Sequence, residues 1–123
     1  MPEVVKFVAD YRAATKKTPS ARDWFGYVGM HSVRLAAEKA KSLEGPKMAK
    51  ALEDLELPPD VALQSGKIRY RAGDHELMAN IFIGEAHPPK SGADDVFTTS
   101  VLVGGEEAAG SVADTGCKMV EPA

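Results

Sequence analysis

The hydrophobic pattern of this chain changes its period once, and that change limits what the chain can fold into. Up to about residue 57, apolar residues recur every three or four positions, the spacing of one face of an α-helix. From Gly66 onward they alternate with polar residues, as in half-buried strands. The Pro58-Pro59 pair separates the two regions. Helices therefore come first and strands follow, which predicts an α+β order with helices packed on a small sheet.

Three helices are expected before the break. The first covers residues 3–17 and ends at Thr18-Pro19, because a residue before proline avoids the helical conformation. Ser20 and Asp23 have the spacing of a capping box, so a second helix should span residues 21–42. A third, short helix should follow Gly45-Pro46.

The second helix carries two glycines, Gly26 and Gly29, among Trp24, Phe25 and Tyr27. Each glycine costs a helix about 1 kcal/mol relative to alanine. We therefore expect another part of the protein to approach this helix closely at the glycines.

Three strands are expected after the break, at residues 67–71, 80–84 and 97–103, with a turn at 72–74. Beyond Gly104-Gly105 the residues are small and polar, which indicates an extended or disordered tail. One face of a three-stranded sheet is too small to cover the helical half. The expectation is that part of the fold lies outside this sequence.

Charge is distributed unevenly along the chain. The net charge of -3 lacks the basic excess of nucleic-acid-binding proteins, so no nucleic-acid partner is expected. Residues 1–71 carry 13 basic and 9 acidic side chains, whereas residues 72–123 carry 2 basic and 9 acidic ones. The net charges of +4 and -7 predict an acidic, solvated C-terminal part.

Signals for export and redox state are sparse. The N-terminal residues show no signal peptide, so the sequence taken literally would be cytoplasmic, and no apolar run reaches the ~20 residues of a membrane span. Cys117 is the single cysteine. It is either a free thiol or one half of a disulfide whose partner lies elsewhere, and the sequence leaves both readings open.

Four short motifs occur in an order that resembles one protein family. Lys17-Thr18-Pro19 is similar to a K-x-P segment that follows a helix, and residues 29–33 (GMHSV) to a helical G-Y-D-A motif, with Met30 and His31 in place of tyrosine and aspartate. Residues 66–70 (GKIRY) are similar to a G-x-I-x-F strand, and residues 71–76 (RAGDHE) to R-x-x-D-H-Q. Over residues 3–86 the chain thus resembles the last third of the type I periplasmic solute-binding proteins, the leucine/isoleucine/valine-binding family of ABC importers.

The resemblance implies an α/β fold of two lobes with a ligand cleft between them, far longer than this chain. Residues 1–90 would supply the C-terminal third, with lobe and hinge segments, and residues 91–123 the final strand and a small polar tail of the same domain. The implied function is capture of a small amino-acid-like or aromatic-carboxylate solute in the periplasm, without chemistry or cofactor. The implied partners are the solute and the membrane permease of the importer.

Three aromatic residues are the candidate ligand contacts: Phe25 first, then Tyr27, then Trp24. In the family this stretch borders the cleft, and an aromatic ring offers a rigid apolar face to a ligand side chain. The competing interpretation is that all three are core residues. Asp74 and His75 would suit acid–base or metal chemistry, but no further ligand stands at metal-binding spacing, so a structural turn is expected and no catalytic or metal site is predicted.

A second functional class stays open. The chain could be a truncated homologue that binds no solute and acts as an interaction domain on another chain. Self-association is also predicted, on two grounds. The helical half carries exposed apolar side chains, and unpaired sheet edges are templates for pairing with another chain. The acidic second half would repel its copy, so the expected contact lies within residues 1–71.

Overall fold

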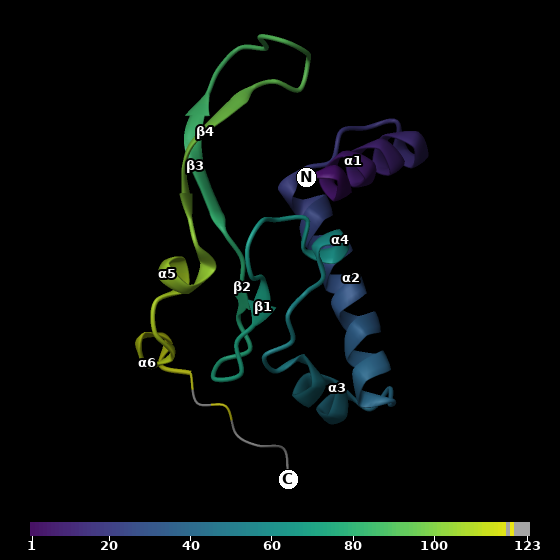
Figure 1. Ribbon diagram of the computed structural model, residues 1–123, viewed down its shortest axis with the longest axis vertical. Coiled ribbons are helices and arrows are strands. Elements are labelled where there is room, and N and C mark those ends of the chain that lie inside the picture. The colour runs from purple at the N-terminus through teal and green to yellow at the C-terminus, as the bar shows by residue number, and fades with distance from the viewer. Residues whose placement is uncertain (118, 120–123) are drawn as a thin grey trace.

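The computed structural model describes residues 1–117 and 119 (Figure 1). Helices come first, small strands follow, and two short helices close the described part. The elements are α1 (Pro2–Thr15), α2 (Ala21–Ala40), α3 (Gly45–Leu52), α4 (Pro59–Ala62), β1 (Arg69–Tyr70), β2 (Leu77–Met78), β3 (Ile81–Ala86), β4 (Phe97–Val103), α5 (Gly105–Ala109) and α6 (Val112–Thr115). The mixture of helices and small antiparallel sheets agrees with the expected α+β order.

The start of α2 follows from its capping residues. The Asp23 carboxylate accepts hydrogen bonds from the backbone amide of Ser20 at 2.8 Å and from its hydroxyl at 2.7 Å. These bonds fix the first turn at the residue that the sequence predicts. At the other end Lys41 adopts a left-handed conformation with φ of 49°, which stops the helix.

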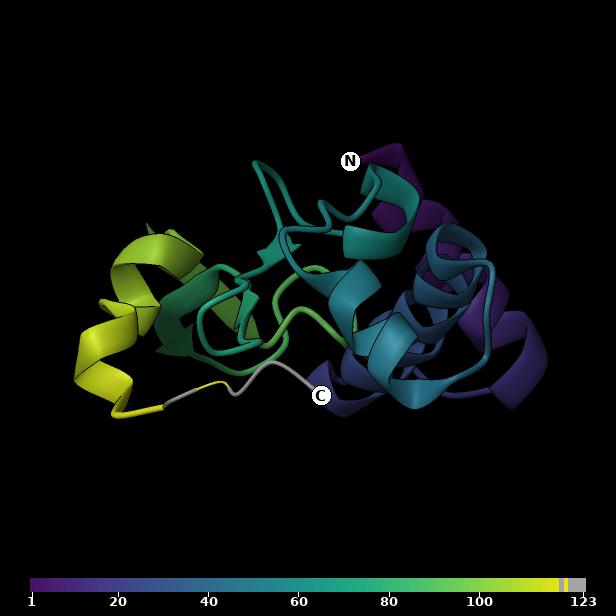
Figure 2. The same cartoon turned by 90° about the horizontal axis from the view of Figure 1, so that it is seen from below.

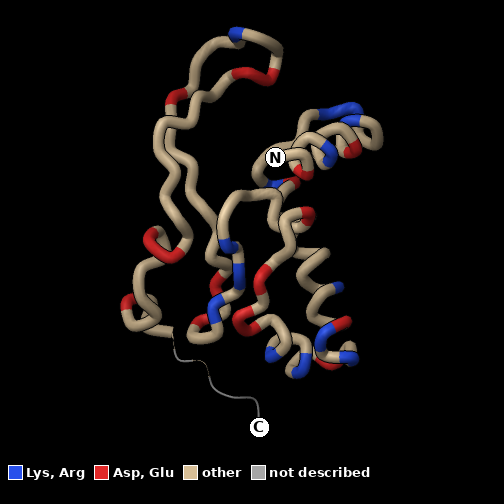
Figure 3. The backbone as a smooth tube through the Cα atoms, in the orientation of Figure 1, with Lys and Arg blue, Asp and Glu red and all other residues tan. Residues whose placement is uncertain are grey.

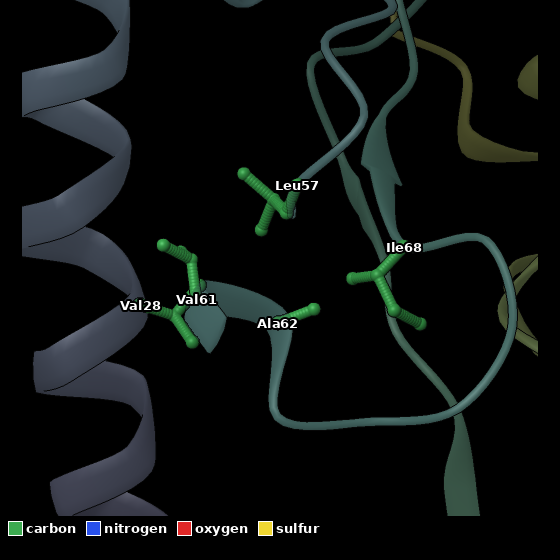
Figure 4. Close-up of a cluster of buried hydrophobic side chains, with 5 residues drawn as sticks. All are labelled: Val28, Leu57, Val61, Ala62 and Ile68. Atoms are coloured by element: carbon green, nitrogen blue, oxygen red, sulfur yellow. The ribbon is translucent and has the colours of Figure 1, made fainter. Parts of the chain in front are cut away.

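The hydrophobic core lies between the middle of α2, the short helix α4 and the segment that enters β1 (Figure 4). Val28 lies in α2, Ile68 is the residue directly before β1, and both residues are 1% exposed. Leu57, Val61 and Ala62 fill the space between them. The Pro58-Pro59 pair therefore does more than end the helical region, because α4 begins at it and delivers two core residues.

The strands form two separate two-stranded sheets, so the expectation of one three-stranded sheet is wrong. β1 pairs antiparallel with β2, and β3 pairs antiparallel with β4. A side chain explains the separation: the Asn80 backbone amide donates to Gln64 Oε1 at 2.8 Å. The backbone between β2 and β3 is thereby bound to the α4–β1 loop, and it does not continue the β1–β2 ladder.

The β3–β4 hairpin projects away from the helices, and its connecting loop reaches back toward α1 (Figures 1 and 2). At that loop the Asp94 carboxylate pairs with Arg12 and accepts a hydrogen bond from Thr18 at 2.7 Å. Large apolar side chains on both strands remain about half exposed to solvent: Ile81, Phe82, Ile83, Phe97, Val101 and Leu102. A two-stranded sheet with so little cover is marginal by itself.

Residues 105–115 are not an extended tail, contrary to the sequence-based expectation, because they form α5 and α6. Ser111 and Asp114 make a capping box at the start of α6, with the Ser111 hydroxyl 2.7 Å from the carboxylate. Arg69 holds α5 through Glu106, at 2.6 Å. The spacing of Ser111 and Asp114 is that of a capping box, but the small residues around this pair favoured the interpretation of an extended tail.

The charge distribution expected from the sequence is visible in space (Figure 3). Lysines and arginines concentrate on the helical half and on β1, whereas the hairpin and α5 carry mainly acidic residues. No helix within the described residues is both long and apolar enough to cross a membrane.

One face of α2 is apolar and exposed. Phe25, Met30 and Val33 are 60%, 71% and 49% exposed. Gly26 and Gly29 lie on the same face, and within the described chain a Cβ atom on either would have no neighbour within 4 Å. The expected close approach at these glycines is therefore wrong for the part of the protein described here.

Candidate functional site

A groove lies between α1, α2 and α4. Its volume is about 370 Å³, within the range of small-molecule sites. It is lined by Glu3, Lys6, Phe7, Asp10, Tyr11, Tyr27 and Asp60. The α1 residues recur every three or four positions, so one helical face supplies most of the groove.

Three aromatic rings form the apolar part of the groove. The ring centroids of Phe7 and Tyr27 are 4.9 Å apart, and those of Phe7 and Tyr11 are 6.1 Å apart. All three side chains are partly exposed. The Tyr27 ring also contacts His31, with centroids 4.3 Å apart, so part of its surface is already covered.

The two tyrosine hydroxyls are engaged in the structure. Tyr27 donates to the backbone carbonyl of Asp60 at 3.0 Å, and Tyr11 donates to Asp23 Oδ1 at 2.7 Å. These bonds connect α2 to α4 and α1 to the start of α2. They hold the rings in place, so the groove is preorganised.

Asp23 supports the groove by accepting the hydrogen bond of Tyr11. Hydrogen bonds from the Ser20 backbone, from Tyr11 and from the Ser20 hydroxyl lower the pKa of Asp23 to about 2. Because the folded-state pKa is depressed, the contribution of Asp23 to stability is present above its ordinary pKa near 3.8 and disappears as the pH falls through about 2. The attachment of Tyr11 is thus fully formed at neutral pH.

Acidic residues outnumber basic ones around the groove. Lys6 is ion-paired with Asp10 at 2.5 Å, and this pair raises the lysine pKa. Glu3 and Asp60 have no ion-pair partner within the described part of the chain. The groove therefore combines aromatic surface with an excess of two carboxylates.

A smaller hollow of about 230 Å³ lies where the hairpin approaches α2. Trp24, Leu63 and Phe82 supply its apolar walls. The Trp24 indole donates to the backbone carbonyl of Ala62 at 2.9 Å, which fixes the ring against α4.

The structure thus separates the three aromatic residues that the sequence proposed as ligand contacts. Tyr27 lines the larger groove and Trp24 the smaller hollow. Phe25 lines neither, and its ring stacks edgewise on Trp24 with centroids 4.8 Å apart. Phe25 is turned by about 100° from Trp24 around the helix axis, which takes it off their face. Trp24 and Tyr27, three residues apart, share a helical face, but they lie one turn apart along α2 and so line different hollows.

Phe7 and Tyr11 are the residues that the sequence analysis missed. Their spacing of four was visible, but it predicts a packing stripe as readily as a ligand wall. The sequence also placed the charged groove residues Glu3 and Asp10 on the same face of this helix as the two aromatic rings, which could have indicated a polar and aromatic surface there.

The Asp74–His75 turn is held by structural contacts. Arg71 makes two bonds to the Asp74 carboxylate, at 3.0 and 2.5 Å, and a third to the carbonyl of Gly110 at 2.6 Å. The hydrogen bonding of Arg71 to the Asp74 carboxylate lowers the pKa of Asp74. His75 Nε2 lies 3.3 Å from Glu53 Oε1. Among the described residues, no group of three or more metal-ligating side chains converges.

In comparisons with known proteins, no protein-family model, curated protein or solved structure matches this chain.

Proposed function

We propose that this chain is part of the solute-binding component of an ABC importer, where it captures a small amino-acid-like or aromatic-carboxylate ligand and performs no chemistry on it. The observation that carries the proposal is the aromatic groove between α1 and α2, to which the candidate residue Tyr27 contributes. The order of the four motifs in residues 3–86 is the reason for proposing this family. By the same resemblance the site of action is the periplasm and the partner is a membrane permease.

The exposed apolar surfaces support a role within a larger assembly. The α2 face of Phe25, Met30 and Val33 is open, and the two glycines between them leave space for another backbone. Exposed apolar patches of this kind mark interaction sites. They fit a fold in which further polypeptide covers α2 and closes the cleft.

Leucine should therefore bind the 123-residue chain only weakly. The groove gives one aromatic wall without enclosure, so we expect a Kd of about 1 mM or weaker. Tyr27→Leu should remove the binding, and Phe97→Leu on the hairpin should leave it unchanged. Calorimetry measures both. Micromolar binding would show a complete site, and no binding at tens of millimolar would remove the main support for solute capture.

The β3–β4 hairpin favours the second candidate, an interaction domain that associates with another chain. Its two strands leave both outer edges unpaired within the described chain, and most of its large apolar side chains are about half exposed. Unpaired edges of this kind are sites for strand addition.

Self-association is another form of that candidate, and we expect it to use the α2 face and not the hairpin edges. Because the hairpin and α5 are acidic, we expect two copies to meet through the α2 face in the basic half, and Met30→Lys should weaken the dimer by placing a charge in the contact. Sedimentation at micromolar concentration tests this. A single monomeric species with a cooperative melt above about 60 °C would show that the chain needs no partner.

A further inference from the structure

The groove between α1 and α2 has an electrostatic character that an apolar packing defect would not need. Its aromatic walls come from Phe7, Tyr11 and Tyr27, and both tyrosine hydroxyls already donate to oxygen atoms elsewhere. The Tyr27 ring also contacts His31, with centroids 4.3 Å apart, so a ligand would meet the part of its π surface that His31 and Phe7 leave open, together with the rings of Phe7 and Tyr11. An aromatic face carries partial negative charge and attracts cations.

The charged residues of the groove act in the same direction. The lysine that lines it, Lys6, is neutralised by Asp10 at 2.5 Å. Glu3 and Asp60 remain as unmatched negative charges among the described lining residues. A carboxylate near an aromatic wall favours an ammonium group and opposes a ligand carboxylate.

We propose that this groove binds the ammonium end of a small apolar amine, with the cation against Phe7 and Tyr27 and with Glu3 and Asp60 supplying the opposite charge. The inference rests on the proposed function in treating the groove as a solute site, and it goes further by assigning the chemical group that binds there. A zwitterionic amino acid then binds weakly because its carboxylate is repelled, unless a cation from further polypeptide receives it. Of the two ligand classes of the proposed function, the inference therefore favours the amino-acid-like one over an aromatic carboxylate that has no amino group.

Three ligands that differ by one group provide the test. 3-Methylbutylamine is leucine without its carboxylate, and 3-methylbutan-1-ol replaces the ammonium by a neutral hydroxyl. Calorimetry on the full chain at low salt should show the amine binding about tenfold more tightly than either of the others. The amine affinity should fall as salt is added, because the charges of the groove are partly exposed.

Matched substitutions locate the effect. Phe7→Leu and Glu3→Gln should each weaken amine binding about fivefold, whereas Phe97→Leu and Glu107→Gln, the same changes on exposed residues outside the groove, should alter it less than twofold. Circular dichroism establishes that each variant is folded. If Phe7→Leu does not fold, the three-ligand comparison in the unaltered chain decides alone.

The outcomes separate this inference from the proposed function. Equal affinity for amine and alcohol, or amine binding that a folded Phe7→Leu variant retains, would overturn the inference. Leucine binding as tightly as the amine would overturn it as well, while leaving solute capture supported. Amine binding without leucine binding would uphold the inference and weaken the assignment to amino-acid capture.

Discussion

Replacing Ile68 by alanine is expected to lower the free energy of unfolding by about 2–5 kcal/mol. Ile68 is 1% exposed and packs against Leu57, Val61 and Ala62, so truncation leaves a cavity at the centre of the core. Typical domains have only ~5–15 kcal/mol of net stability. Chemical denaturation followed by circular dichroism should show the change as a lower midpoint.

Ile81→Ala is the matched control, since it is the same change on a residue that is 50% exposed. It should cost less than about 1 kcal/mol. Equal losses at the two positions would mean that the core does not lie between α2, α4 and the entry to β1.

Gly105→Ala is the second substitution with a large expected effect, about 3 kcal/mol. A Cβ atom at this position would lie 2.7 Å from the backbone nitrogen of Ala79 and from the Met78 carbonyl oxygen. Backbone atoms cannot rotate away as side chains do, so α5 would have to leave β2. Its contact through Arg69 and Glu106 would then be lost too.

Gly104→Ala provides the neighbouring control. Within the described chain no atom lies within 4 Å of a Cβ at Gly104, and its φ of -64° suits any residue. Its stability should therefore stay within about 1 kcal/mol of the unaltered chain. Thermal melts of both variants compare them directly, and a harmless Gly105→Ala would contradict the close packing of α5 on β2.

Local sequence signals predicted the helices well because their ends are determined locally. The capping box of Ser20 and Asp23 and the proline at residue 19 act within one turn of the helix boundary. The β4 strand, Phe97–Val103, was also predicted with its observed bounds, from β-branched and aromatic residues alone.

Strand pairing was harder to predict because it depends on contacts distant in sequence. β1 joins β2 rather than β3 because Gln64 binds the backbone at Asn80, which alternation of apolar residues cannot reveal. The short helices α4 and α6 were not predicted, for a different reason. α4 has four residues and α6 has four, too short for a hydrophobic period to be recognised.

The candidate site could be predicted only in part. Tyr27 was proposed from its place in an aromatic-rich helix, but the groove exists because α1 packs near α4 and the first turns of α2 and brings Phe7 and Tyr11 to it. That approach is a tertiary contact. The assignment of one site to Trp24, Phe25 and Tyr27 together did not allow for the rotation that turns Phe25 away, nor for the packing of different elements beside Trp24 and Tyr27 along α2.

The central claim is that the α1–α2 groove is where this protein meets its solute. The most direct measurement is a nitrogen-15 NMR titration of the full chain with leucine and, separately, with 3-methylbutylamine. The account predicts saturable shifts at Phe7, Tyr11 and Tyr27 for both ligands, larger at equal concentration for the amine. Shifts centred instead on Trp24 and Phe82, or no saturable shift with either ligand, would contradict it.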